Sequence, residues 1–198
     1  MDNYHNKDWY MNKFAKDYTK DAGWVDIASD LLSTYTWLTE EDVNKFSAEQ
    51  LSVIKQGYEI DKDPLHKEFP DFLIHSNFNS TQLQIIITAY KNDVSFEDIK
   101  KYIGSEEMPY NKMNYISQAL VDGIDVFNDV DHKEWDIDQI NEIYAAAKSG
   151  VDLPVIEDYK KYHYSAETMG LIRHAYELGL AVRYTTDEET CLMVNIGK

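Results

Sequence analysis

Residues 78–91 read FNSTQLQIIITAYK, and this stretch decides the predicted fold. An aromatic residue and a polar helix starter come first, followed by Leu83, Ile86 and Ala89 at intervals of three. Residues three or four apart lie on the same face of an α-helix. The stretch therefore predicts a helix with one apolar face.

The same phrase occurs five times along the chain. Each copy has Leu, Met or Ile at its first apolar position, Ile three residues later, and a small residue three residues after that. The copies are Leu51, Ile54 and Gly57; Leu83, Ile86 and Ala89; Met113, Ile116 and Ala119; Ile140, Ile143 and Ala146; and Met169, Ile172 and Ala175. A period of about 30 residues is typical of two-helix repeats, which bury their apolar faces against their neighbours.

Each copy also carries a helix start signal four residues before its first apolar position. The start residues are Ser47, Asn79, Pro109, Asp136 and Ser165. In three copies a Gln follows three residues later, which is the spacing of a capping box, whereas the third copy has Lys112 there. A large side chain precedes each start residue and is expected to pack on the first turn: Phe46, Phe78, Met108, Trp135 and Tyr164.

These patterns predict an all-α protein, with repeats of about 30 residues that form a short α-solenoid or a compact helical array. We expect N-terminal capping helices in residues 1–45, five tandem helical repeats in 46–182, and a C-terminal cap in 183–198. The cap is compatible with a last helix or with a small hairpin. Short second segments are expected at 95–103, 153–162 and, more briefly, 127–130.

Composition narrows the classes of function. The 198 residues carry a formal charge of −17, from 36 acidic and 19 basic residues, so the protein is expected to repel nucleic acid and attract basic protein surfaces. A single cysteine, Cys191, excludes an intramolecular disulfide. No apolar run is long enough to cross a membrane, and we expect a cytoplasmic location without membrane contact.

Motifs for catalysis and for cofactors are missing from the sequence. The six histidines lack the spacing that places two metal ligands on one helix face. There is no glycine-rich phosphate loop, nucleophile elbow or dinucleotide fingerprint. We therefore expect a non-enzymatic protein with no metal and no cofactor, and the competing hypothesis of a hydrolase requires a pocket with convergent, perturbed carboxylates.

The most unusual local feature is an acidic segment that runs from Asp122 to Glu142. It has eight acidic residues and one lysine, Lys133. Such a row of carboxylates is compatible with a solvated loop, or it could imitate a phosphate backbone for a groove lined by Lys and Arg. Trp135 is either an aromatic anchor for the partner or a core residue. The candidate partner-binding residues are Asp122, Asp125, Asp129, Asp131, Glu134, Trp135, Asp136, Asp138 and Glu142.

The repeated phrase resembles helical repeats in small proteins of phages and conjugative elements of low-GC Gram-positive bacteria. The clearest stretches are FNSTQL at 78–83, GIDV at 123–126 and GVDL at 150–153, and the resemblance covers about residues 46–182. Size and acidity are similar to those of anti-CRISPR and anti-restriction proteins. The resemblance implies an inhibitor that binds a basic surface of a host defence protein, such as a CRISPR nuclease. The alternative is a general interaction scaffold that uses a concave aromatic face of the repeats.

Overall fold

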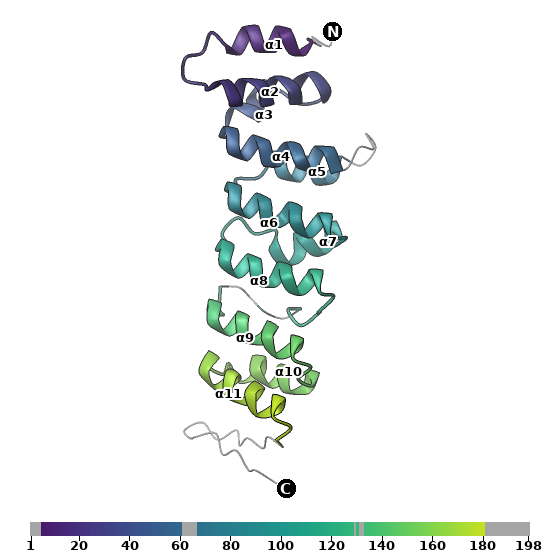
Figure 1. The fold of residues 1–198 in the computed structure, drawn as a ribbon, viewed down its shortest axis with the longest axis vertical. Helices are drawn as coiled ribbons and strands as arrows, with labels where there is room; N and C mark the ends of the chain where they lie inside the picture. The colour runs from purple at the N-terminus through teal and green to yellow at the C-terminus, as the bar shows by residue number, and fades with distance from the viewer. Residues whose placement is uncertain (1–4, 61–66, 129, 131–132, 181–198) are drawn as a thin grey trace. The chain divides into compact units, whose positions relative to one another are not determined.

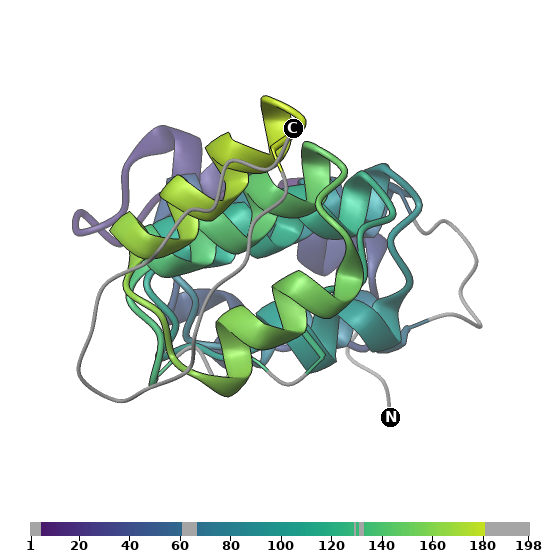
Figure 2. The ribbon, with the colours of Figure 1, turned by 90° about the horizontal axis from the view of Figure 1, so that it is seen from below.

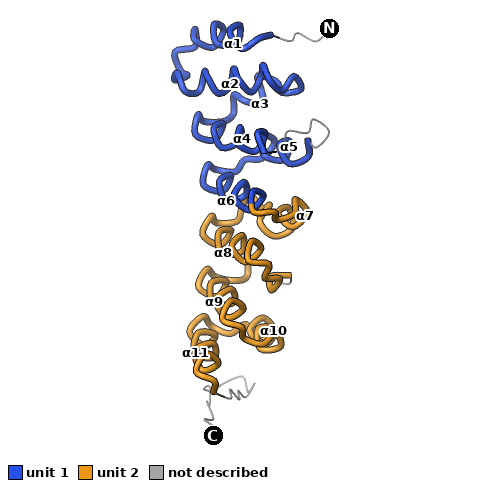
Figure 3. Tube along the Cα trace, turned by 45° about the vertical axis from the view of Figure 1, so that its right-hand side comes forward, with its two compact units in different colours: residues 1–91 blue, residues 92–198 orange. Residues whose placement is uncertain are grey.

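The computed structural model describes residues 5–60, 67–128, 130 and 133–180 (Figure 1). Over these residues the protein is all-α and contains no β-strand, which confirms the expected fold class. The chain divides into two compact units, Met1–Lys91 and Asn92–Lys198 (Figure 3). The C-terminal segment, where a helix and a hairpin were both considered, lies outside the described residues, as does Cys191.

Unit 1 is built from pairs of helices that pack in chain order. Its helices are α1 (Lys7–Phe14), α2 (Ala22–Thr34), α3 (Glu40–Asn44), α4 (Ala48–Ile60), α5 (Glu68–Ile74) and α6 (Ser80–Lys91). Helix α2 packs against α1 and α4, and α4 in turn packs against α5 and α6. The core of the unit therefore lies between consecutive long helices.

Unit 2 has a similar order, with one irregular helix near its start. Its elements are α7 (Phe96–Asp98), the π-helix η1 (Ile99–Ile103), α8 (Tyr110–Val121), α9 (Ile137–Lys148), α10 (Leu153–Lys161) and α11 (Ala166–Glu177). Helix α8 packs against η1 and α9, while α9 packs against α10 and α11. Figure 2 shows α9 and α11 on one side of this unit and α10 on the other.

The repeated apolar positions are buried in all five copies. They lie on α4, α6, α8, α9 and α11, and the first two positions of every copy are at most 2% exposed. Burying one such side chain stabilises the fold by about 1.5–3 kcal/mol. The three apolar positions are thus buried in every copy, as their shared spacing predicts. The interpretation of these helices as tandem repeats stays a prediction.

The small third position allows close packing between helices. At Gly57 an added Cβ would lie only 2.4 Å from Cδ1 of Leu73 on α5. A larger residue at this position would therefore force the Leu73 side chain to move. Just after the C-terminal ends of α8, α9 and α11, Gly123, Gly150 and Gly179 adopt φ values of 71°, 77° and 68°. This is the left-handed conformation that closes a helix.

Local hydrogen bonds set the starts of the long helices. The side chain of Asp136 accepts from the backbone N–H of Gln139, and the Gln139 side chain accepts from the backbone N–H of Asp136. Ser47 with Gln50 and Asn79 with Gln82 make the same reciprocal pair. The predicted capping boxes are thus confirmed.

The residue at the capping-box Gln position also connects one copy to the next. Nε2 of Gln50 donates to the carbonyl of Phe78 at 2.9 Å, and Nε2 of Gln139 donates to the carbonyl of Tyr164 at 2.9 Å. Each acceptor is the residue just before the next start residue. Lys112 makes the corresponding bond, from its Nζ to the carbonyl of Trp135. The lysine of the third copy therefore preserves the connection that glutamine makes elsewhere.

Helix α2 shares this connection, although its sequence lacks the repeated phrase. Asp21 caps the helix by accepting from the backbone N–H of Trp24, and Nε1 of Trp24 donates to the carbonyl of Phe46 at 3.0 Å. Val25, Ala28 and Leu31 occupy the three apolar positions and are buried. Helix α2 thus has the same kind of cap, buried face and connection as the later long helices.

We expect Gln139→Glu to lower the free energy of unfolding by about 1–2 kcal/mol, because the carboxylate cannot donate to the Tyr164 carbonyl. Glu still suits a capping box, so the cap itself should persist. The matched change Lys112→Gln should alter the free energy of unfolding by less than about 0.5 kcal/mol. The reason is that Gln donates to the corresponding carbonyl in other copies. Urea denaturation followed by circular dichroism measures both. Equal stability of Gln139→Glu and the unmodified protein would contradict the role of the bond.

The short second segments differ between copies. Residues 96–103 form α7 and η1, and α10 covers most of the segment expected at 153–162. The third expectation was wrong, because the described residues 127, 128 and 130 are not helical. Asn and Asp compete with helix formation through their side chains, and this part of the chain contains Asp125 and Asn128. The connection between α8 and α9 therefore has no second helix over its described residues.

Candidate functional site

The acidic segment provides the candidate site, and its residues have three kinds of surroundings. Asp129 and Asp131 lie outside the described residues. Among the others, two carboxylates are held in ion pairs within unit 2, the indole is buried, and the remaining carboxylates are exposed. The segment is therefore not one continuous row of equivalent charges.

Asp122, the C-cap of α8, makes hydrogen bonds to two residues of α9. Its Oδ2 accepts hydrogen bonds from Nζ of Lys148 and from the hydroxyl of Tyr144, both at 2.8 Å. The bond from Lys148 is the main cause that lowers the pKa of the Asp122 carboxyl, and the bond from Tyr144 adds to it. The charge of Asp122 is thus matched within the protein.

Glu142 has a similar role between α9 and α11. Its Oε2 lies 2.9 Å from Nε of Arg173, and the Glu142 side chain is only 18% exposed. Arg173 also pairs with Glu177 on its own helix at 2.9 Å. Both Asp122 and Glu142 therefore pair with another helix of unit 2, although Glu142 is largely covered whereas Asp122 stays exposed.

Trp135 belongs to the core. The residue is 2% exposed, and its ring stacks on His163 with a centroid distance of 4.7 Å and an interplanar angle of 23°. Its backbone carbonyl accepts the bond from Lys112. Of the two roles that the sequence left open, this placement favours packing over anchoring a partner.

The accessible acidic residues collect at the start of α9. We name Glu134, Asp136 and Asp138 the α9 acidic edge, and all three are exposed. Asp136 is the N-cap and Asp138 lies in the first turn. The N-terminus of a helix carries a partial positive charge that offsets part of the repulsion between these carboxylates. The backbone of Asp136 and Asp138 is thus held in place by a capped helix of twelve residues, while Glu134 lies in the turn before it.

Two neighbours complete the electrostatic surroundings. The single lysine of the segment, Lys133, pairs through Nζ with Oε2 of Glu107 at 2.6 Å. Asp125 is exposed, and its Oδ1 accepts from Nδ2 of Asn128 at 2.6 Å. The one lysine of the segment is therefore already paired with a carboxylate.

The carboxyl groups of the described residues show pKa shifts in one direction only. Wherever the pKa of such a group is shifted, it is lowered, mainly by hydrogen bonds or ion pairs, as at Asp30 with Lys55 and at Glu177 with Ser149 and Arg173. A general acid at neutral pH needs the opposite shift. In the same part of the chain, no three His, Cys, Asp or Glu side chains gather as a metal site would require.

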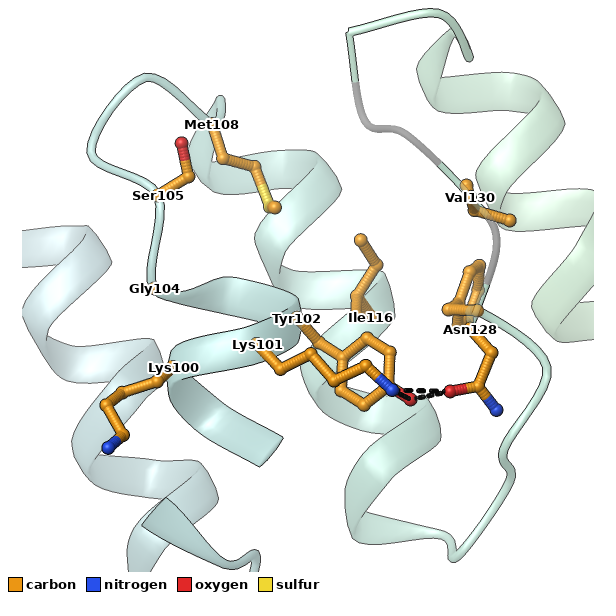
Figure 4. A pocket seen from close by; sticks show the side chains of 10 residues that line it. Lys100, Lys101, Tyr102, Gly104, Ser105, Met108, Ile116, Asn128 and Val130 are labelled. Carbon is orange, nitrogen blue, oxygen red and sulfur yellow. Dashed lines mark hydrogen bonds between the residues drawn. The ribbon is translucent and has the colours of Figure 1, made fainter. Parts of the chain in front are cut away.

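Sequence reasoning missed a cavity next to the acidic segment. It has a volume of about 240 Å³ and lies between η1, α8 and residues 127, 128 and 130 (Figure 4). Lys101, Tyr102 and Asn128 meet at one side of it, while Met108 and Ile116 contribute apolar surface. No local signal in the sequence could have found it, because its lining comes from segments that only packing brings together.

Among the described helices, none is both long and apolar enough to cross a bilayer. Comparison with protein-family models, with curated proteins and with solved structures finds no match to this chain.

Proposed function

We propose that this protein is a non-enzymatic inhibitor from a phage or mobile element, which binds a basic, nucleic-acid-binding surface of a host defence protein. The observation that carries the proposal is the α9 acidic edge, three exposed carboxylates within five residues on a capped helix start. The formal charge of −17 extends the negative field over the rest of the chain. An RNA-guided nuclease is the partner class that we favour, because it holds nucleic acid in a positively charged channel.

The chemistry of recognition follows from the spacing of these carboxylates. Lys and Arg in a nucleic-acid channel are arranged to contact successive phosphates. Carboxylates on a rigid backbone can accept the same charge-assisted hydrogen bonds with little loss of conformational entropy. The ion pairs of Asp122 and Glu142 support the site indirectly, since they hold α9 against its neighbours.

The test neutralises the α9 acidic edge without changing its shape. The variant Glu134→Gln, Asp136→Asn, Asp138→Asn removes three charges, and Asn is as good an N-cap as Asp. Binding to a panel of purified RNA-guided DNA nucleases, and displacement of labelled DNA from them, is measured by fluorescence anisotropy. We expect the variant to bind at least tenfold more weakly than the unmodified protein, which corresponds to about 1.4 kcal/mol.

A matched control removes three exposed charges from unit 1, with Glu41→Gln, Glu49→Gln and Glu59→Gln. The control should keep nearly full affinity, because overall charge affects mainly the rate of encounter. Equal weakening by the two variants would show that only net charge matters. Unchanged affinity of the α9 variant at low salt would refute the proposed site.

Salt separates the proposal from the alternative of a scaffold that binds through aromatic and apolar side chains. Between 50 and 200 mM salt, an interaction made by exposed carboxylates should weaken by about tenfold or more. The alternative has its own support in the exposed apolar residues Leu153 of α10, Tyr162 directly after α10, and Leu171 of α11. A complex that persists at high salt but fails after Tyr162→Ala and Leu171→Ala would favour the scaffold.

A further inference from the structure

We propose that the outer face of α11 is a docking site for an amphipathic helix of a partner protein, with basic residues beside its apolar stripe. The outer face of α11 consists of the exposed residues Glu167, Leu171, His174 and Leu178. The proposal goes beyond the proposed function, because it uses no residue of the α9 acidic edge. It rests on the positions of the two leucines, on the contacts between the preceding helices, and on charge.

Two positions of the repeated phrase make contacts from one long helix of unit 2 to the next. They lie two and nine residues after the first apolar position. In the copy on α9, Glu142 pairs with Arg173 of α11 at 2.9 Å, and Oγ of Ser149 donates to Oε1 of Glu177 at 2.7 Å. In the copy on α8, the second position is Asp122, which accepts hydrogen bonds from two residues of α9. In Figure 1 the three helices α8, α9 and α11 follow one another in this order.

On α11 the same two positions are occupied by Leu171 and Leu178. Helix α11 is the last helix of the described residues, and the two leucines are 53% and 61% exposed. They are seven residues apart, so they lie on one side of the helix, about 10 Å apart along its axis. The outer face of α11 therefore presents apolar side chains where the preceding copies contact their next long helix.

The chemistry of these positions changes between the copies. In the copies on α8 and α9 the contacts are made by polar side chains, namely Asp122, Glu142 and Ser149. The outermost unit of a stacked helical array needs a polar outer face for solubility. Two leucines at a spacing of seven are instead the pattern that packs on another amphipathic helix. The outer face of α11 thus fits the apolar stripe of a further helix.

Acidic side chains flank the two leucines. Glu167 is exposed one turn before Leu171, and Glu177 is exposed directly before Leu178. The arginine of α11, Arg173, is already paired with two carboxylates. The chain as a whole has a formal charge of −17. A partner helix with basic residues is therefore favoured, whereas a second copy of this chain would be repelled.

The probe is a synthetic helix, a fluorescein-labelled peptide with the sequence Leu-Lys-Lys-Leu-Leu-Lys-Leu repeated twice. Its binding to the full chain is measured by fluorescence anisotropy. The variant Leu171→Gln with Leu178→Gln should weaken binding by about tenfold or more, because both apolar contacts are lost. The control Tyr110→Gln with Leu153→Gln changes side chains that are 56% and 55% exposed on α8 and α10. It should change binding by less than about twofold.

A second peptide tests the charge of the partner helix. It has the same pattern with Glu in place of Lys, and it should bind about fivefold more weakly or less, because its charge no longer complements that of the chain. The proposal is wrong if the two peptides bind equally well. It is also wrong if the leucine variant keeps its affinity, or if the leucine variant and its control lose affinity to the same extent.

Two other occupants would also overturn the proposal. If Leu192→Gln with Val194→Gln strengthens binding of the lysine peptide by about fivefold or more, residues 181–198 compete for the outer face of α11. If the unmodified chain sediments as a dimer and the leucine variant as a monomer, the occupant is a second copy. None of these outcomes bears on the α9 acidic edge, since that site is tested with purified nucleases.

Discussion

Replacement of Trp135 by Ala is expected to lower the free energy of unfolding by about 3–5 kcal/mol. The indole is 2% exposed and stacks on His163, so its removal leaves a cavity at the start of α9. The same backbone position accepts the bond from Lys112, and loss of packing there should loosen that connection as well. Urea denaturation monitored by circular dichroism measures the change.

Two further variants separate packing from partner binding. Trp135→Phe keeps a ring in the core and should recover much of the lost stability. Tyr110→Ala removes an aromatic residue that is 56% exposed, and it should change the free energy of unfolding by less than about 1 kcal/mol. If Trp135→Ala instead leaves stability unchanged and weakens partner binding, Trp135 is an anchor and not a core residue.

The second large effect is expected from adjacent residues of α11. Ile172 is fully buried, whereas Leu171 is 53% exposed. Ile172→Ala should lower the free energy of unfolding by about 2–5 kcal/mol, because it removes three buried carbon atoms and leaves a cavity. Leu171→Ala should cost less than about 1 kcal/mol. The two changes have almost the same effect on helix propensity, so their difference reports burial.

Chemical denaturation of the two α11 variants, together with amide hydrogen exchange, measures this difference. Exchange shows whether Ile172→Ala destabilises all of unit 2 or only its last helix. Similar losses for the two variants would mean that the face with Ile172 is not the core face. Such a result would also contradict the use of the repeated spacing to assign the core.

The helices were predictable because their causes are local. The spacing of Leu83, Ile86 and Ala89 places apolar side chains on one face, and Asn79 with Gln82 satisfies the first-turn amides. Both effects act over one or two turns, so they can be read from adjacent residues. Helix α2 was harder to recognise as a related unit, since its connecting residue is Trp24 in place of Gln.

The candidate site was predictable only in part. The density of acidic residues located the α9 acidic edge, but charge alone could not show which carboxylates are accessible. Asp122 is matched by Lys148, 26 residues away, and Glu142 by Arg173, 31 residues away. Partners at such distances are brought together by helix packing. The cavity beside η1 was not predicted, because its lining comes from η1, α8 and residues 127, 128 and 130, which only packing brings together.

The sequence by itself determined the all-α class, the starts of the capped long helices and the apolar face that each repeated phrase buries. These follow from hydrogen bonds and spacing within one helix. Only the tertiary structure decided that Trp135 is buried, that Glu134, Asp136 and Asp138 remain exposed, and that η1 lines a cavity. Exposure depends on which helices pack against each other, and this is a property of contacts between residues far apart in the chain.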